Sequence, residues 1–469
     1  LRARHDTPEL ALAEGRAFFN DTVVEPDPAR CRALVQRIGA IRARHDTPEL
    51  ALEECKALVN TTHREPDPAR CLALAERIGV LRARHNTPEL ALMEVLALVN
   101  ATVVEPDPGL RFAIANRIGA LCAEHDTSEF AAAEGRALVN VTVVEPDPGR
   151  RLALAERIGA LRARHDTSEL ALEQGEALVN AAFVEPDLGR RLALAERIGA
   201  LRARHETPEL ALAEGQALYN ATLIQSDPAR RLVLVERIGA LRAQHDTSEL
   251  ALEEGKALHN ETVFEPDPAQ CLALAERIGA LRSRHDTPAL ALQEGQALVN
   301  AAASEPDSDR RLALAERIGA LRTRHDTPEL ALVEGKALYN VTVSEPDPIR
   351  FLDLAERIGA LRSRHDTPEL ALVEGMALVN ATVGEPDPAR RLALADRIGA
   401  LHLRHDTPEL AFEEGKALYN ATVIEPNPAR RHALAERIGA LRARHDTPEL
   451  AHAESKALYS ATGRIAGDA

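Results

Sequence analysis

The sequence predicts an all-α fold, a right-handed α-α superhelix (solenoid) of about twelve two-helix repeats of 40 residues each. Three observations support this prediction. The period of 40 residues runs through the chain without insertion or deletion, and each period holds two helix-start signals followed by amphipathic runs. No alternation long enough for a β-strand occurs. A unit of this kind packs only on its neighbours, so residues 1–469 are expected to form a single continuous domain.

The repeating units are in register from the first residue. Because Leu1 falls in the middle of a predicted helix, we expect a fragment of a longer chain. Neither end carries a polar capping helix. Exposed apolar ends would favour end-to-end self-association. The units start at residues 1, 41, 81, 121, 161, 201, 241, 281, 321, 361, 401 and 441.

One repeat can be read from Pro348 to Asp387, and its first helix follows the pair Asp347-Pro348. An Asp-Pro pair is a helix-start signal, since the carboxylate caps free amides and proline suits the first turn. Leu354, Ile358 and Leu361 then share one stripe of a helix of four to five turns. Charged residues occupy the opposite side, so this helix is amphipathic.

The second helix starts at Thr367-Pro368-Glu369, with threonine as the cap and a favourable acidic residue in the first turn. Its apolar arc includes Leu370 and Ala377. Glu374 falls inside this arc, where a buried carboxylate needs a partner. We expect it to pair with arginines equivalent to Arg37 or Arg2 in neighbouring helices.

Two glycines recur inside the helices, at Gly359 and Gly375 in this unit. A glycine within a helix costs about 1 kcal/mol relative to alanine. Both glycines lie on the apolar sides of their helices, which predicts close helix–helix approach at these points.

The unit resembles the tetratricopeptide repeat. Ile358-Gly359 is similar to the Leu-Gly of that family's first helix, Ala371 to the small alanine of its second, and an Asp-Pro turn follows. The family's tryptophan and its aromatic packing positions are missing here. The resemblance implies a superhelix whose first helices line a concave, protein-binding groove.

A second resemblance stays open as an alternative. The segment TPELALVEGMALVNAT, residues 367–382, resembles the third helix of an armadillo repeat, with Asn380 at that family's asparagine. The first helix lacks the break that divides the armadillo unit's first two helices. The alternative implies an armadillo- or HEAT-like solenoid.

Composition argues against several classes of protein. The formal charge is 57 − 73 = −16 and aromatic residues make up only 3%, which disfavours nucleic-acid binding. No apolar run approaches the ~18–20 residues of a membrane span. Five cysteines, an odd number without a CxxC pair, favour a reducing, cytoplasmic location.

Arginines recur at two positions of the first helix, seven residues apart and therefore on one face. The tetratricopeptide resemblance implies that they line the groove, where they would grip an acidic peptide through their rigid donor fork. The alternative is a salt-bridged face. The first row comprises Arg37, Arg77, Arg117, Arg157, Arg197, Arg237, Arg277, Arg317, Arg357, Arg397 and Arg437. The second row comprises Arg44, Arg84, Arg164, Arg204, Arg284, Arg324 and Arg364.

Asparagines recur on the second helix, facing away from its apolar arc. They are the second-choice partner-binding row, in which side-chain amides would hold an extended peptide backbone. The alternative is a solvated residue or one bonded to the next loop, and the Asn-x-Thr pattern is not expected to carry glycans. The row comprises Asn60, Asn100, Asn140, Asn180, Asn220, Asn260, Asn300, Asn340, Asn380 and Asn420.

A histidine recurs in every unit, from His5 to His445, each followed by Asp, Asn or Glu and then Thr. Equivalent helices in a stack lie ~8–10 Å or more apart, whereas zinc ligands converge at ~2.0–2.1 Å from one ion. We therefore expect no shared metal, and a histidine that favours the negative C-terminal end of its helix.

Every motif is copied, whereas a catalytic cleft needs several different groups at one place. We therefore expect no enzyme activity, no catalytic residue and no cofactor or metal. The predicted function is a scaffold that binds a protein or peptide, possibly acidic, in a concave groove. An RNA-binding solenoid would need variable polar residues at a fixed groove position, and the arginine rows are nearly uniform. A structural spacer without a dedicated ligand is the third alternative.

Overall fold

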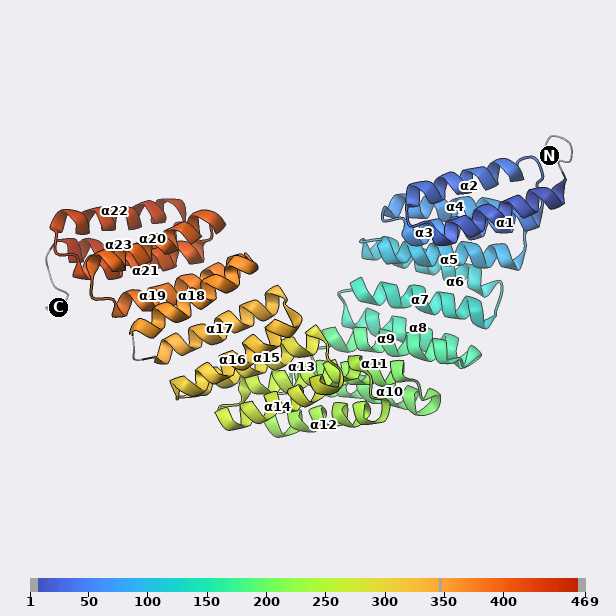
Figure 1. The fold of residues 1–469 in the computed structure, drawn as a ribbon. Helices are drawn as coiled ribbons and strands as arrows, with labels where there is room; N and C mark the ends of the chain where they lie inside the picture. The colour runs from blue at the N-terminus through green and yellow to red at the C-terminus, as the bar shows by residue number, and fades with distance from the viewer. Residues whose placement is uncertain (1–6, 346–347, 463–469) are drawn as a thin grey trace. The chain divides into compact units, whose positions relative to one another are not determined.

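The computed structural model describes residues 7–345 and 348–462. Within them it contains 23 α-helices and no β-strand (Figure 1). Successive helices pack in pairs along the chain. The prediction of an all-α helical-repeat solenoid is therefore confirmed.

The odd-numbered helices are the second helices of the repeat when it is read from Pro348 to Asp387, as in the sequence analysis. In the numbering of units from Leu1, each begins at residue 8 of a 40-residue unit. They are α1 (Pro8–Val24), α3 (Pro48–Arg64), α5 (Pro88–Val104), α7 (Ser128–Val144), α9 (Ser168–Val184), α11 (Pro208–Thr222), α13 (Ser248–Phe264), α15 (Pro288–Ser304), α17 (Pro328–Ser344), α19 (Pro368–Gly384), α21 (Pro408–Ile424) and α23 (Pro448–Ala461).

The even-numbered helices are the first helices of the sequence unit. Each begins directly after an Asp or Asn residue. They are α2 (Pro28–Arg42), α4 (Pro68–His85), α6 (Pro108–Ala123), α8 (Pro148–His165), α10 (Leu188–His205), α12 (Pro228–His245), α14 (Pro268–Arg284), α16 (Ser308–His325), α18 (Pro348–Arg364), α20 (Pro388–His405) and α22 (Pro428–Arg444).

The predicted start signals act as helix caps. The Thr47 hydroxyl accepts a hydrogen bond from the Leu50 amide at 3.3 Å, and the Asp67 carboxylate accepts one from the Ala69 amide at 3.0 Å. Each cap satisfies an amide that has no partner inside the helix. The short turns between helices follow from these closely spaced caps, which recur along the chain, although Thr127 at the start of α7 makes no such bond.

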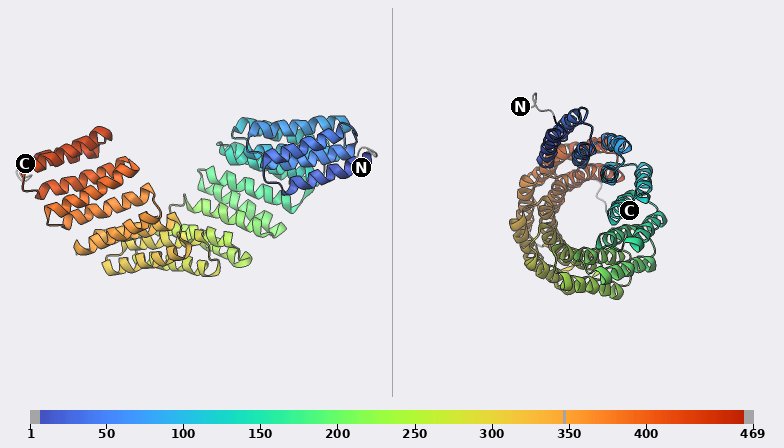
Figure 2. Two further views of the ribbon diagram at one scale, coloured as in Figure 1. Left: turned by 45° about the horizontal axis from the view of Figure 1, so that its top comes forward. Right: turned by 90° about the vertical axis from the view of Figure 1, so that its right-hand side faces the viewer.

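The contacts between residues divide the chain into two compact halves. The first half comprises residues 1–226 and 243–245, and the second half comprises residues 227–242 and 246–469. Within each half the helices form two rows, one odd-numbered and one even-numbered, which appear as separate layers (Figure 2).

The odd row is the more closely packed of the two. Within each half of the chain, consecutive odd-numbered helices contact one another, whereas consecutive even-numbered helices of the described chain do not approach to the same distance. A row of closer helices lies on the inner side of a curved stack. The second helices of the sequence unit therefore form the inner row, and the first helices do not line it as the tetratricopeptide resemblance implies.

Small residues explain the close approach of the odd helices. A Cβ atom on Gly375 would lie 3.3 Å from Leu410 Cδ2 of the next odd helix. Ala51 and Leu50 are buried almost completely in the same layer. The expected close approach at this glycine position is thus confirmed. Ile78 and its equivalents complete the core between the two rows.

Candidate ligand-binding surfaces

A buried carboxylate joins the two rows in the way that the sequence predicts. Glu94 is 1% exposed and accepts hydrogen bonds from Arg82 Nε at 2.6 Å and Arg117 Nη2 at 2.7 Å. These arginines are the equivalents of Arg2 and Arg37, so the expected pairing is confirmed. A Cβ atom on Gly79 would lie 3.0 Å from Glu94 Oε1, so the glycine makes room for the carboxylate.

The first arginine row is occupied by contacts within the chain. Arg117 binds Glu94, and Arg197 binds Glu156 at 2.8 Å, an acid one unit earlier. Most of the row makes ion pairs of one of these two kinds. The arginines with such pairs are Arg77, Arg117, Arg157, Arg197, Arg277, Arg317, Arg357, Arg397 and Arg437.

The second arginine row is paired as well. Arg84 Nη2 lies 2.5 Å from Asp46 Oδ2 of the preceding unit, and Arg284 lies 2.8 Å from Asp246. The same contact recurs along the described chain at Arg164, Arg204, Arg324 and Arg364. The arginines that make these pairs lie on even-numbered helices and form a salt-bridged face, whereas Arg44 lies just beyond the end of α2.

The recurring histidines link consecutive units through the same aspartates. His85 Nε2 lies 3.1 Å from Asp46 Oδ1, and His325 Nε2 lies 2.9 Å from Asp286 Oδ1. Both histidines are in the last turn of their helices, as expected. The bond to the preceding unit was not predicted. His5 lies outside the described residues.

Shallow hollows separate neighbouring even-numbered helices. The hollow between α6 and α8 has a volume of about 680 Å³ and is lined by Phe112, Arg150 and Arg157. Another, between α12 and α14, has a volume of about 450 Å³ and is lined by Arg277. The even-helix face therefore has openings, but its arginines already contact carboxylates.

The asparagine row is committed to hydrogen bonds between units. Asn100 Nδ2 donates to Thr62 Oγ1 at 3.0 Å, and Asn140 donates to Thr102 at 2.9 Å. The same bond recurs from Asn60, Asn180, Asn300, Asn380 and Asn420. The Asn-x-Thr pattern thus supplies both a donor and an acceptor, one toward each neighbouring unit.

One face of the odd row varies strongly between units, and it runs from mostly buried residues at position 13 to half-buried or exposed ones at position 16. We call positions 13, 16 and 19 of each unit the inner strip; in α17 these are Val333, Lys336 and Tyr339. Their spacing of three residues keeps them on one helix face. Position 16 carries Arg16, Lys56, Leu96, Arg136, Glu176, Gln216, Lys256, Gln296, Lys336, Met376, Lys416 and Lys456.

Two residue types occur only in the inner strip. All five lysines of the chain are at position 16, and all four tyrosines are at position 19. The tyrosines are Tyr219, Tyr339, Tyr419 and Tyr459. Recurring positions point to the other faces of the helices, so they did not predict this one. The restricted placement of lysine and tyrosine was the available signal.

The strip is continuous across units because neighbouring side chains meet. His259 Nδ1 of α13 lies 3.1 Å from Gln293 Oε1 of α15. Lys416 pairs with Glu413 within its own helix at 2.6 Å. Burial raises the pKa of Tyr339, and Glu413, two odd helices away, raises it further.

The strip is unevenly charged. Where position 13 is glutamate, the lysine three residues later is neutralised, as at Lys256 and Glu253, 2.8 Å apart. Lys336 follows Val333 instead and is exposed. In α9 the strip carries Glu173 and Glu176, and burial together with the charge of Glu176 raises the pKa of Glu173 to about 7.

The sequence matches no protein-family model, and no curated protein is significantly similar to it. The structural finding is therefore a helical-repeat solenoid without an assigned family. Throughout the described part of the chain, every helix falls short of the length and apolarity that a membrane crossing requires.

Proposed function

We propose that this solenoid is a protein-binding scaffold whose inner strip holds an extended segment of a partner protein. The observation that supports it most strongly is that this partly exposed face, which varies between nearly identical units, carries every lysine and tyrosine of the chain. Uniform positions build the stack, whereas varied side chains give successive units different contacts. Varied contacts are what a scaffold needs in order to select one partner.

The chemistry of the strip suits a segment that carries both aromatic or apolar and acidic side chains. Tyrosine is enriched where binding energy concentrates, because it offers a large apolar surface and a polar tip. Exposed Lys336 lies one helical turn from Tyr339. A partner segment with an acidic residue close to an aromatic one would pair with Lys336 and pack against Tyr339. The arginine rows are a weaker choice because their donors already bind carboxylates of this chain.

RNA binding is the second candidate, and one observation favours it. Position 16 is a fixed position with varied polar residues, which is what recognition of successive bases by helical repeats requires. The formal charge of −16 opposes it, since phosphate contacts need a basic surface. We therefore rank protein binding first, and a spacer without a ligand last.

Within this proposal, the inner position of the second helices supports an armadillo- or HEAT-like unit over a tetratricopeptide-like one. A cytoplasmic location fits the five cysteines, which are all free and buried. No enzyme activity is proposed, since the repeated ion pairs serve packing between helices.

The test is affinity capture from cell extract with three forms of the chain. The inner-strip variant carries Lys336→Glu and Tyr419→Ala. The control variant carries Arg390→Glu and Leu403→Ala, a matched pair of exposed changes on the even-helix face. Circular dichroism verifies that all three forms are folded.

The proposal expects a protein that the wild type and the control capture and the inner-strip variant loses, with or without ribonuclease treatment. Loss only in the control variant would place binding on the even-helix face and contradict the proposal. Capture that disappears with ribonuclease would favour the RNA alternative. No specific capture by the wild type would favour the spacer.

A further inference from the structure

One histidine interrupts the ion-pair pattern of the even row. At position 2 of the unit the sequence carries arginine throughout, except for Cys122 and His402. In the ordinary arrangement the guanidinium lies between two carboxylates: Arg42 Nε is 2.6 Å from Glu54 Oε2, and Arg42 Nη1 is 3.1 Å from Asp46 Oδ1. His402 replaces that permanent cation with an imidazole.

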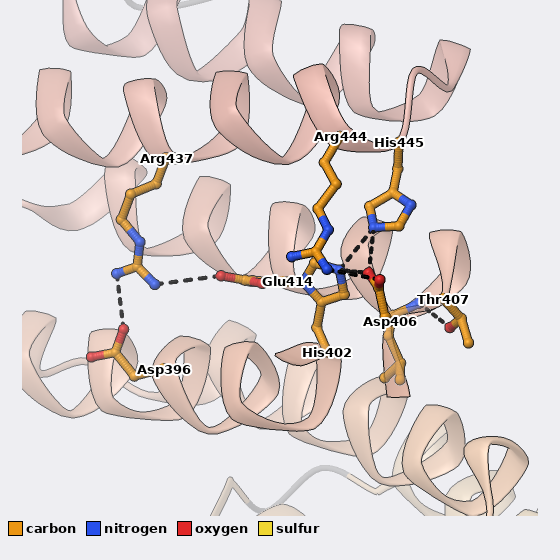
Figure 3. A network of polar contacts seen from close by, with 9 residues as sticks. Asp396, His402, Asp406, Thr407, Glu414, Arg437, Arg444 and His445 are labelled. Atoms are coloured by element: carbon orange, nitrogen blue, oxygen red, sulfur yellow. Dashed lines mark hydrogen bonds and ion pairs between the residues drawn. The ribbon is translucent and has the colours of Figure 1, made fainter. Parts of the chain in front are cut away.

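The replacement brings two imidazoles and a carboxylate together between α20 and α22 (Figure 3). His402 Nε2 lies 3.0 Å from His445 Nε2. Asp406 Oδ1 lies 3.1 Å from His445 Nε2 and 3.6 Å from His402 Nε2. His402 is 2% exposed, so its ring orientation is fixed by packing.

Neighbouring groups orient these three atoms. His402 Nδ1 lies 3.0 Å from Glu414 Oε2. An ionised carboxylate can only accept, so His402 Nδ1 carries the proton and its Nε2 keeps the lone pair in the neutral ring. Arg444 Nη2 holds the other oxygen of Asp406 at 2.7 Å. Three donor atoms thus converge, all within 4.8 Å of one another.

The spacing suits a metal ion. Ligand atoms bound at ~2.0–2.1 Å in a tetrahedral arrangement lie about 3.3 Å apart, and the separations here run from 3.0 to 3.6 Å. A carboxylate behind the histidine, as Glu414 is here, is the usual support of a metal-bound imidazole. A divalent cation would also replace the positive charge that His402 removes from between Glu414 and Asp406.

We propose that His402, His445 and Asp406 form a binding site for a late first-row divalent cation such as Zn²⁺. The ion completes its coordination with water, which the half-exposed side chain of Asp406 allows to enter. Bound metal ties α20 to α22. This inference is independent of the proposed function, and it differs from the sequence-based expectation of no metal, which rested on the uniform histidine row.

Cys122 shows that loss of the arginine alone does not create such a site. Its Sγ donates to the Phe130 carbonyl oxygen at 3.2 Å. Burial raises the pKa of the thiol to about 12, so it stays protonated. Among the described residues, only the group around His402 combines three converging potential ligands.

The test is Zn²⁺ binding to chelator-treated full chain, measured by calorimetry and by competition with a chromophoric indicator. His402→Arg restores the residue that other units carry at this position and should fold. His325→Gln is the matched control, because it alters a ladder histidine in α16 outside the cluster.

The wild type and His325→Gln are expected to bind one Zn²⁺ per chain and to gain thermal stability with it. His402→Arg is expected to bind at least ~10-fold more weakly, with no thermal shift. Cobalt substitution should give visible d–d absorption in the wild type and lose it in His402→Arg. Absence of stoichiometric Zn²⁺ binding to the wild type, or equal binding to His402→Arg, would overturn the proposal.

Discussion

Asn100 of α5 donates its side-chain amide to the Thr62 hydroxyl of α3, at 3.0 Å, and so ties one unit to the next. Thr62 in turn donates to the Val59 carbonyl oxygen of its own helix at 2.8 Å. The stability of a repeat array depends on couplings of this kind between neighbours, since no central core exists.

The hydrogen bond between Asn100 and Thr62 should appear as an energetic coupling between the two residues. Asn100→Ala and Thr62→Ala are each expected to lower the free energy of unfolding by about 0.5–1.5 kcal/mol, the usual net worth of a hydrogen bond. The double variant should lose less than the sum of the two single losses, because both single changes remove the same Asn100–Thr62 hydrogen bond. Urea unfolding followed by circular dichroism measures the stability of all three variants. Strictly additive losses would show that the Asn100–Thr62 hydrogen bond contributes nothing.

The buried Glu94 should be among the most sensitive polar positions. Glu94→Ala leaves Arg82 and Arg117 without their carboxylate and is expected to lower the free energy of unfolding by about 2–3 kcal/mol, less than for a fully buried pair because both arginines are partly exposed. Glu94→Gln should cost less, since Gln174 naturally fills the equivalent place and accepts from Arg162 Nε at 2.9 Å.

The control for Glu94 is Glu76→Gln, an exposed change in the adjoining helix that should alter stability by less than about 0.5 kcal/mol. The urea midpoints of the three variants give the comparison. Equal midpoints for Glu94→Ala and Glu76→Gln would mean that the buried ion pair does not stabilise the stack.

Gly359 and Gly375 should respond differently to substitution by alanine. In Gly359→Ala the new Cβ would lie 3.0 Å from Glu374 Oε1, and the strain on a buried ion pair should outweigh the gain of about 1 kcal/mol in helix propensity. In Gly375→Ala the nearest atom is Leu410 Cδ2 at 3.3 Å, which can move slightly. Thermal unfolding should show a lower Tm for the first variant and an unchanged or higher Tm for the second.

The sequence supports this distinction, because the position of Gly375 is filled elsewhere by Cys55 and Val95. The position of Gly359 is glycine in every unit that contains it. A higher Tm in Gly359→Ala would show that the carboxylate does not need the space.

Glu173 should make stability depend on pH near neutrality. Its pKa is raised to about 7, first by burial and then by Glu176. The folded chain therefore binds a proton that the unfolded chain releases near pH 4.5, so this residue's contribution falls as pH rises from about 4.5 through 7. The free energy of unfolding should fall by up to about 3 kcal/mol less with rising pH in Glu173→Gln than in the wild type.

The measurement is the urea midpoint at pH 5.5 and at pH 8.5, for wild type and Glu173→Gln. The difference between the two pH values should shrink in the variant. Glu253→Gln is the control, because Lys256 already neutralises Glu253 at 2.8 Å. An unchanged pH difference in Glu173→Gln would contradict the assignment.

The sequence predicted the fold well because the signals are local and repeated. Thr367 and Pro368 mark the start of α19, and the apolar place of Glu374 required the arginine partners that the structure shows at Arg362 and Arg397. The inner row was not predictable in the same way. The direction of curvature depends on how closely each row packs, which no single unit encodes.

The site was predicted less well for a related reason. His85 was assigned to its own helix end, and its bond to Asp46, 39 residues earlier, depends on how units stack. Recurrence does not mark residues that vary between units, such as Lys336 and Tyr339. The contact of His402 with His445 required the spacing between neighbouring even helices.

The most direct test of the inner-strip proposal is site-specific photo-crosslinking. A photoreactive amino acid is placed at Lys336 on the inner strip, or at exposed Ser363 on the even-helix face, and irradiated in cell extract. The account predicts a discrete crosslinked protein from position 336 and none from position 363. A crosslink from position 363 alone, or no discrete product from position 336, would contradict it.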